Sequence, residues 1–252
     1  MKDNFSNISE SYLKFRPEFP FEFIDTLCNL SAEKNLAWDC GTGNGQVAKH
    51  LAKHFVQVIA TDVSKNQIDK AIKLPNIDYR VEAAEHSTLA KKSVNLLVIA
   101  QAIHWFDFEN FYKEASRVLT NGGIIAAIGY PLFTTDNENL NNAISYFYSE
   151  IIGKYWDAER RYIDEKYKTI PFPFEEFDLP KFEMTYHWNY EQLVGYLSSW
   201  SAVEHYKKQN NKNPVEFIDD DLRKLMPESF MVDVSFEIIG RYGFVFDDSI
   251  YI

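Results

Sequence analysis

The sequence has few cysteines, a deficit of positive charge and no long apolar run. Only two of its 252 residues are cysteines, Cys28 and Cys40, too few and too differently placed for the disulfide framework of a small secreted protein. Lysine and arginine total 26 against 37 aspartates and glutamates, so the net charge is −11. This excess of negative charge argues against binding along a nucleic acid backbone or on an anionic membrane.

The sequence also shows no pattern typical of a membrane-spanning segment or a secretory signal. No uninterrupted apolar run approaches the roughly 20 residues that cross a bilayer, and the first residues do not form a basic segment followed by an apolar stretch. We therefore expect a cytoplasmic protein. Hydrophobic residues make up 46% of the chain and aromatic residues 16%, which is enough for one large domain or one domain with a sizeable insertion.

The most informative stretch is residues 36–45, Leu-Ala-Trp-Asp-Cys-Gly-Thr-Gly-Asn-Gly. A short apolar run ends in Asp39 and then breaks into three glycines at alternate positions, and residues 46–55 carry apolar side chains at helical spacing. This order predicts a strand, a glycine turn and a helix, the opening of a βαβ unit. Glycine lets the backbone approach a ligand closely, and a helix N-terminus offers unpaired N–H groups. We expect a polar or anionic ligand here.

Further strands are predicted at residues 57–62, 77–81, 95–100 and 124–128, with helices such as 64–74 between them. Five strands alternating with helices over residues 36–130 predict a doubly wound, Rossmann-like α/β fold with a mostly parallel sheet. Ligands of such sheets bind at the carboxyl ends of the strands. The segments that fall there are Gly41–Gly45, Asp62, Ala83–Glu85 and Gln101–Trp105.

Asp62 has two possible roles. It follows Gly45 by 17 residues, close to the offset at which a dinucleotide fold places a carboxylate on the hydroxyls of a ribose. The alternative is a helix N-cap, a task that suits Ser64 at least as well. Because Asp62 stands at this spacing from the glycine turn, we favour ligand binding.

The chain is expected to divide into three parts. In residues 230–239, near the end of the chain, apolar and polar side chains alternate at period two. We expect this strand to pair with residues 242–246 across Gly240 and Arg241. The parts are an N-terminal cap and ligand-binding core at 1–130, an α-rich, aromatic-rich lid inserted over the strand ends at 131–225, and antiparallel edge strands that rejoin the core sheet at 226–252.

The residues around the glycines favour one class of ligand. A dinucleotide fingerprint would have glycine or alanine where this chain has Gln46. Asp39 would repel a nearby pyrophosphate, yet its carboxylate could accept hydrogen bonds from an ammonium group. These features favour a nucleoside with a cationic amino-acid tail over a diphosphate.

The chain resembles the class I S-adenosylmethionine-dependent methyltransferases. The resemblance covers residues 36–130 and rests on Asp39–Gly45, Asp62, Ala84-Glu85, Gln101–Trp105 and Leu119–Gly123. Within this class the chain is similar to the trans-aconitate methyltransferase-like branch of small-molecule enzymes. The residues that carry this narrower resemblance are Tyr12, Arg16-Pro17, Gln101–Asp107 and Ser199–Val203.

The resemblance implies S-adenosyl-L-methionine as the cofactor, S-adenosyl-L-homocysteine as its product, and a role for each residue of the motif. Asp39 would lie near the ammonium group, Asp62 would hold the ribose hydroxyls, and Gln101 would lie near the sulfonium or the methionine carboxylate. The glycine loop, with Gly41, Thr42, Gly43 and Gly45, would hold the methionine part, and the turn with Ala84 and Glu85 would meet the adenine edge. Many relatives carry acids where this chain has Ala83 and Asn95.

The expected reaction is in-line methyl transfer to an oxygen of a small carboxylic acid, which needs alignment and exclusion of water but no base. A hydroxyl or amine acceptor would need a base, and His104 is the candidate by position; a hydrogen-bonded structural ring is the alternative. Arg16 could clamp an acidic acceptor. The resemblance favours a catalytic role for Tyr12, and Trp105 and Tyr130 are expected in the substrate pocket.

Arg160 and Arg161 could also clamp an acidic acceptor, but we favour their interpretation as solvated surface charge. His50 and His54 lie one helical turn apart, but Leu51 stands where a zinc protease helix has glutamate, so no metal site is expected. A nicotinamide-dependent oxidoreductase is disfavoured by Gln46 and Asp39. A non-catalytic cofactor-binding module stays open, because a fold does not fix a function.

Overall fold

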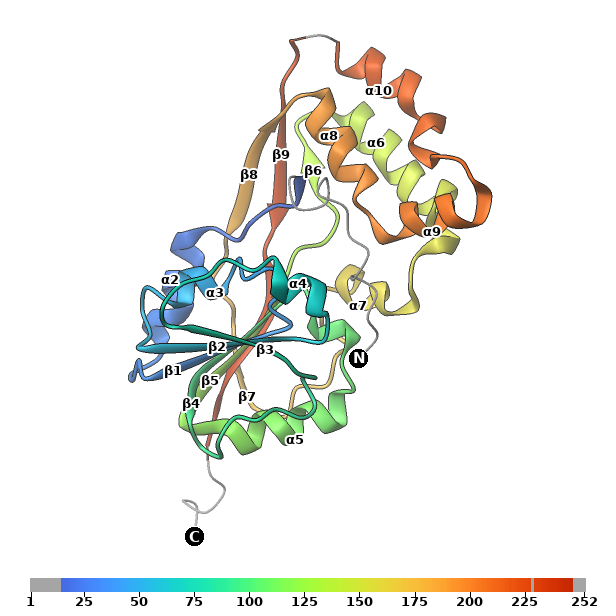
Figure 1. Cartoon of the computed structure of the whole chain (residues 1–252). Coiled ribbons are helices and arrows are strands. Elements are labelled where there is room, and N and C mark those ends of the chain that lie inside the picture. Colours follow the sequence, from blue (N-terminus) through green and yellow to red (C-terminus); the bar gives the residue numbers. More distant parts are fainter. Residues whose placement is uncertain (1–14, 228, 247–252) are drawn as a thin grey trace.

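A computed structural model describes residues 15–227 and 229–246 and contains a seven-stranded sheet flanked by helices (Figure 1). The strand order is β3-β2-β1-β4-β5-β10-β7. The first five strands pair in parallel, and β10 pairs antiparallel with both β5 and β7. This confirms the predicted mostly parallel α/β sheet. The strands are β1 (Leu36–Cys40), β2 (Gln57–Asp62), β3 (Ile77–Val81), β4 (Val94–Ala100), β5 (Leu119–Gly129), β7 (Glu175–Phe177) and β10 (Ile239–Val245).

Apolar side chains cover both faces of this sheet, which explains why its central strands read as nearly continuous apolar runs. Successive residues of a strand point to opposite faces. In β4, Leu96 and Val98 pack on the side of α2 (Phe21–Leu30) and α3 (Ala48–Leu51). Leu97 and Ile99 pack on the side of α5 (Phe108–Val118). One strand therefore contributes to two cores.

Two helices of the core are shorter than the sequence pattern predicts. The predicted helix 46–55 is regular only over α3, although hydrogen bonds from Lys49 N to Gly45 O and from Phe55 N to Leu51 O continue its turns at both ends. The predicted helix 64–74 is regular over α4 (Lys65–Asp69), which begins at the capping side chain of Ser64. Both predicted helices are present, but their regular parts begin later and end earlier than predicted.

A second lobe lies above the carboxyl ends of the core strands (Figure 1). Its three-stranded sheet has the order β6-β9-β8. The strands are β6 (Thr134–Thr135), β8 (Glu183–Trp188) and β9 (Val232–Glu237), and the α-helices of residues 131–227 are α6 (Glu138–Tyr146), α7 (Arg161–Asp164), α8 (Tyr190–Ser198), α9 (Ser201–Asn210) and α10 (Asp219–Leu225). The remaining short helices are η1 (Ile103–Trp105), η2 (Phe147–Ile151), η3 (Gly153–Tyr155), η4 (Ala158–Arg160) and η5 (Pro214–Phe217).

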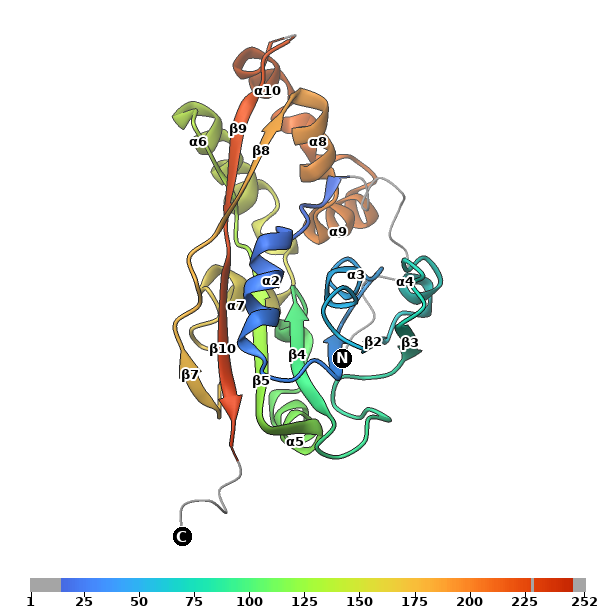
Figure 2. The same cartoon turned by 90° about the vertical axis from the view of Figure 1, so that its left-hand side faces the viewer.

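The predicted hairpin of the last strands is wrong. β9 pairs with β6 and β8, whereas β10 pairs with β5 and β7, and the two strands follow one another as one extended segment that joins both sheets (Figure 2). Gly240 is not a turn residue. It lies opposite Ile128 of β5, where an added Cβ would stand 2.3 Å from the carbonyl oxygen of Ala127. Glycine is needed at this position because the backbones of β10 and β5 approach each other closely.

The outermost strand of the large sheet is also not the one expected. β7, which follows the prolines at positions 171 and 173, lies at the edge beyond β10 and pairs Phe177 with Tyr242. Arg241 holds this edge, since its Nε donates to Glu176 Oε1 at 2.6 Å. The edge strand therefore comes from the middle lobe segment and not from the end of the chain.

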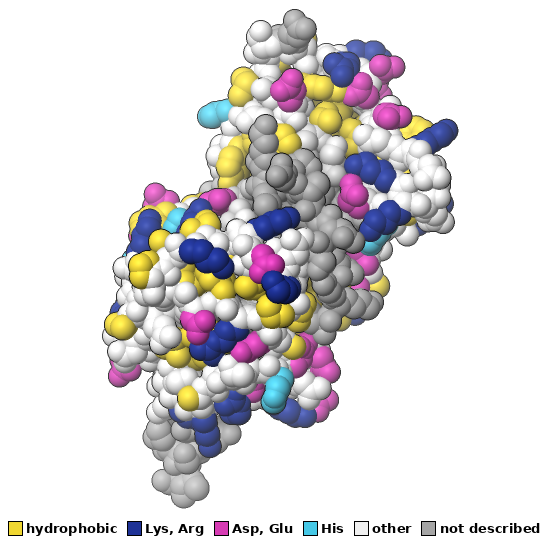
Figure 3. Space-filling model, in the orientation of Figure 1, with side chains coloured by type: hydrophobic (Ala, Val, Ile, Leu, Met, Phe, Trp, Pro, Cys, Tyr) yellow, Lys and Arg dark blue, Asp and Glu magenta, His cyan; other side chains and the backbone are white. Residues whose placement is uncertain are grey.

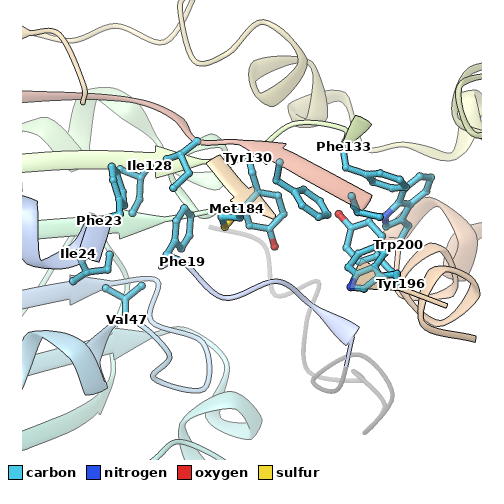
Figure 4. Close-up of a cluster of buried hydrophobic side chains, with 14 of the residues drawn as sticks. Phe19, Phe23, Ile24, Val47, Ile128, Tyr130, Phe133, Met184, Tyr196 and Trp200 are labelled. Carbon is cyan, nitrogen blue, oxygen red and sulfur yellow. The ribbon is translucent and has the colours of Figure 1, made fainter. Parts of the chain in front are cut away.

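Stacked and edge-on aromatic rings connect the core to the lobe. Figure 4 shows Phe19, Tyr130, Phe133 and Tyr196 in a row that runs from the large sheet toward the lobe helices. Phe236 of β9 lies among them, with ring centroids 5.3 Å from Tyr130, 5.4 Å from Phe133 and 5.5 Å from Tyr196. This packing fixes the lobe over the strand ends.

On the face in Figure 3, acidic and basic side chains are interspersed. Within residues 15–227 and 229–246, no helix combines the length and apolar character needed to cross a bilayer.

Replacing Phe236 by alanine tests the joint between core and lobe. Phe236 is fully buried, so Phe236→Ala is expected to lower the free energy of unfolding by about 3–5 kcal/mol. Urea denaturation measures the change. Phe217→Ala is the matched control, because Phe217 is 56% exposed and its loss is expected to cost less than about 1 kcal/mol. Equal losses for both variants would contradict this description of the joint.

Candidate functional site

A cavity of about 140 Å³, here called the first cavity, lies at the carboxyl ends of β1, β2 and β4. Of the residues singled out in the sequence, it brings together Arg16, Asp39, Gly41, Thr42, Gly43, Asp62, Gln101, Trp105 and Tyr130. Asn44 and Ala102, which lie within the segments predicted at the strand ends, also line it. Its other lining residues were not predicted from the sequence; they are Pro17, Phe19, Gln46, Val47, Gln67 and Ala100. The convergence expected from parallel strand ends is therefore present in the fold.

The three loop glycines serve different purposes. All three have positive φ, +73° at Gly41, +55° at Gly43 and +84° at Gly45, a conformation that other residues adopt only with strain. A Cβ on Gly45 would stand 2.1 Å from the hydroxyl oxygen of Tyr79, so this glycine is required for packing and does not line the cavity. A Cβ on Gly43 would meet nothing within 4 Å. Gly43, which lines the first cavity, thus has open space where a side chain would stand.

Asp39 presents a buried carboxylate to the first cavity. Its side chain is 1% exposed, and Thr42 Oγ1 donates to Oδ2 at 2.5 Å. The other oxygen, Oδ1, is buried and has no hydrogen-bond partner among the described residues. Burial raises the pKa of Asp39 to about 7, because the charged form is poorly solvated there. A cation placed beside Oδ1 would satisfy this oxygen and stabilise the ionised form.

Ser64, and not Asp62, takes the N-cap role that the sequence allowed for either residue. Ser64 caps α4 by accepting from Gln67 N. Asp62 accepts from Gly43 N at 2.9 Å and from Ser64 N at 2.8 Å, so its carboxylate joins the glycine loop to the end of β2 and lines the first cavity.

Gln101 lies where the first cavity meets a second one. Its φ is +53°, unusual for a residue with a side chain. Hydrogen bonds from its backbone N to Ile128 O at 2.8 Å and from Nε2 to Tyr130 O at 3.0 Å hold it there. Oε1 is buried without a partner among the described residues. The junction therefore has a fixed, unsatisfied acceptor.

The second cavity, of about 80 Å³, lies between the core and the lobe. It shares Arg16, Gln101, Trp105 and Tyr130 with the first cavity. Its remaining walls are His104, Trp156, Asp157, Arg160, Ile163, Tyr196, Trp200 and Ser201. The shared residues make the two cavities neighbours, so a group bound in one can react with a group bound in the other.

Arg160 faces this second cavity, and its interpretation as surface charge is wrong. Its Nε donates to the Tyr148 hydroxyl at 2.8 Å and its guanidinium lies over the Trp156 ring at 4.8 Å, which orients the group. Asp164 lies 3.5 Å from the same Nε. Arg161 is exposed and donates to the hydroxyl of Tyr162 at the surface, as expected. Adjacent arginines thus have different surroundings.

His104 is a buried neutral ring in the second cavity wall. It is 5% exposed, and the hydroxyl of Tyr167 lies 3.4 Å from Nδ1. Burial, with the positive charges of Arg160 and Arg16, lowers the pKa of His104 to about 3. A ring with so low a pKa is a weak proton acceptor near neutral pH, which argues against the expected alternative of His104 as a general base.

The structure does not bring every predicted residue to the cavities. Gly45, Ala84 and Glu85 are not among the residues that line either one. Ala84 is 2% exposed, and Glu85 Oε1 accepts from Asp107 N at 2.9 Å. Tyr12 lies outside the described residues. The roles proposed for these residues stay predictions.

Metal ligands are not gathered in the described part of the chain, where no group of three or more histidines, cysteines and acids could hold an ion. His54 pairs with Asp25. The charged side chains that line the two cavities are Asp39, Asp62 and Arg16 in the first, and Arg16, Arg160 and Asp157 in the second.

Known proteins with similar sequences and structures carry methyltransferase names. Residues 38–127 match the family described as a methyltransferase domain. The chain is 35% identical to a Dictyostelium discoideum protein described as a methyltransferase, over 94% of this chain and 92% of that one. An uncharacterized methyltransferase of Mycobacterium tuberculosis is 29% identical over 80% of this chain and 78% of its own length. A solved Anaeromyxobacter dehalogenans protein described as a type II methyltransferase is 33% identical, with a TM-score of 0.84, covering 92% of this chain and 99% of that one.

The raised pKa of Asp39 predicts a pH dependence of stability. The folded protein holds the Asp39 proton up to about pH 7, whereas the unfolded chain loses it near 3.8. The wild type therefore loses stability relative to Asp39→Asn as pH rises from about 4 to about 7, by about 2–4 kcal/mol. Urea denaturation across this range measures the difference. The exposed Asp220→Asn substitution is the control, and parallel curves for wild type and Asp39→Asn would contradict the assignment.

Proposed function

Because this chain belongs to the S-adenosylmethionine-dependent methyltransferases, we propose that its first cavity binds S-adenosylmethionine and its second cavity binds a small carboxylic acid. The acid would receive the methyl group on a carboxylate oxygen. Membership confirms the resemblance at the level of the class. The narrower likeness to the trans-aconitate methyltransferase-like branch is part of this proposal.

The residues of the first cavity fit the cofactor. Asp39 Oδ1, buried and without a partner among the described residues, suits the ammonium of the methionine part. The open space beside Gly43 leaves room for the chain of that part, and Asp62, already fixed by two backbone N–H groups, is placed to accept from ribose hydroxyls. Gln101 would then face the reacting end, since it borders both cavities.

The observation that carries the choice of acceptor is the pair of arginines in the second cavity. Arg16 and Arg160 both line it, and a carboxylate offers two oxygens to guanidinium N–H groups. Asp157 is the one carboxylate in the lining of this cavity. Its Oδ2 lies 3.9 Å from Nδ1 of His205. Two cations would repel a protonated amine, and the low pKa of His104 makes its ring a poor base for a hydroxyl acceptor.

The reaction needs positioning more than proton transfer. When bound, S-adenosylmethionine supplies a methyl group on a positively charged sulfur. An oxygen of the acid would form the new C–O bond as the S–C bond breaks, which neutralises both charges and moves no proton. Arg16 and Arg160 would orient the carboxylate, and the aromatic walls Trp105, Trp156 and Trp200 would exclude water.

Binding of S-adenosylhomocysteine tests the first cavity. By isothermal titration we expect micromolar binding, weakened at least tenfold in Asp62→Ala and in Gly43→Ala, whose new methyl group would enter the ligand space. Gly122→Ala is the matched control, because Gly122 also has a positive φ and open space around it but lines neither cavity. Binding of NADH in place of S-adenosylhomocysteine would support an oxidoreductase and overturn the proposal.

A panel of small carboxylic acids tests the second cavity. With labelled S-adenosylmethionine, we expect methyl ester formation and, in Arg160→Gln, a KM for the acid at least tenfold higher with unchanged binding of S-adenosylhomocysteine. The neighbouring surface variant Arg161→Gln is expected to match the wild type. Turnover of amines or alcohols but not acids would contradict the choice of acceptor, and cofactor binding without turnover of any acceptor would favour a non-catalytic module.

A further inference from the structure

Tyr167 is a buried residue behind the second cavity that the proposed reaction does not use. It is fully buried and has a φ of +61°, a left-handed conformation that is uncommon for an aromatic residue. Its backbone N donates to Tyr162 O at 2.7 Å. Gly129, at the end of β5, leaves the space that the hydroxyl of Tyr167 occupies, because a Cβ on this glycine would stand 2.7 Å from the hydroxyl oxygen. Backbone and packing together fix the place of this hydroxyl.

Among the described residues, the hydroxyl of Tyr167 has one hydrogen-bond partner, His104. The oxygen lies 3.4 Å from His104 Nδ1, and the two rings are nearly parallel, with centroids 6.2 Å apart at 28°. Among the described residues, Nδ1 is the acceptor within hydrogen-bond distance of the phenolic proton. A buried O–H group without an acceptor is costly, so the proton is expected to point at Nδ1.

We infer that Tyr167 is a positioning residue that holds His104 in the neutral tautomer with its proton on Nε2, so that His104 donates a hydrogen bond to the acid in the second cavity. A neutral imidazole carries one proton; when Nδ1 accepts from the phenol, that proton must lie on Nε2. The use of this donor toward an acid rests on the proposed function.

The surroundings of His104 agree with a donor in this place. Burial and the two nearby guanidinium groups keep the ring uncharged, so it adds directional hydrogen bonding without a third positive charge. A lone pair on Nε2 would repel a carboxylate held by Arg16 and Arg160, whereas an N–H group there would bind it. Tyr167 would thereby favour an ionised carboxylate, which has no proton to lose, over hydroxyl or amine groups that must lose one.

The tautomer can be read directly, without turnover. The chain has six histidines, and selective labelling with ¹⁵N-histidine allows long-range ¹H–¹⁵N correlation spectra of each ring. The signal lost in His104→Asn assigns His104. We expect the wild type to show one protonated nitrogen, Nε2, unchanged from pH 5.5 to 8.5, and Tyr167→Phe, which keeps the ring, to populate the Nδ1-protonated form. A proton on Nδ1 in the wild type, or an unaltered spectrum in Tyr167→Phe, would overturn the inference.

Kinetics with an acid found in the panel supply the second measurement. Tyr167→Phe is expected to raise the KM for the acid about three- to tenfold, with little change in kcat and none in binding of S-adenosylhomocysteine. Tyr162→Phe is the matched control, because its hydroxyl lies on the same segment but accepts from Arg161 at the surface. An equal rise in KM for both variants would contradict the inference.

The two measurements separate this inference from the proposed function. If no acid is methylated but the spectra show the tautomer and its dependence on Tyr167, the choice of acceptor fails and the Tyr167–His104 arrangement stands. If acids are methylated with the expected dependence on Arg160 but the tautomer does not respond to Tyr167→Phe, the inference fails and the proposed function stands.

Discussion

Apolar packing along the single extended segment formed by β9 and β10 is the constraint on which the site depends. β10 completes the large sheet between β5 and β7, and β9 forms the middle of the small sheet. Phe236 on β9 packs against Tyr130 at the end of β5 and Tyr196 on the lobe, so the same segment that joins the sheets also sets their spacing. The second cavity exists because the lobe is held at this distance from the strand ends.

The electrostatics of the two cavities are opposite, although the chain as a whole is strongly acidic. The first cavity presents the buried carboxylate of Asp39, and the second presents the guanidinium groups of Arg16 and Arg160. A ligand with a cationic tail and a ligand with an anionic head are thereby directed to different sides of Gln101. Low exposure strengthens both preferences, since little water screens the charges.

The sequence predicted the core of the fold well because that core rests on local signals. Each central strand is buried on both faces and reads as an apolar run, and the glycines at 41, 43 and 45 mark a turn that only glycine adopts easily. The membership in the methyltransferase class followed from the same residues. The continuity of β9 and β10 could not be read, because period-two alternation is the same in a hairpin and in one long strand, and Gly240 looked like a turn. Arg160 and Tyr167 acquire their places only through the packing of the lobe, which leaves no periodic signal.

The shared strand segment has a consequence for the order in which the protein can assemble. β5 receives its antiparallel neighbour β10 only after the whole lobe has been synthesised. Until then the nascent chain exposes an apolar sheet edge with free N–H and C=O groups, the kind of surface that invites pairing with other chains. This edge of β5 is therefore open to pairing with other chains until the last strand emerges.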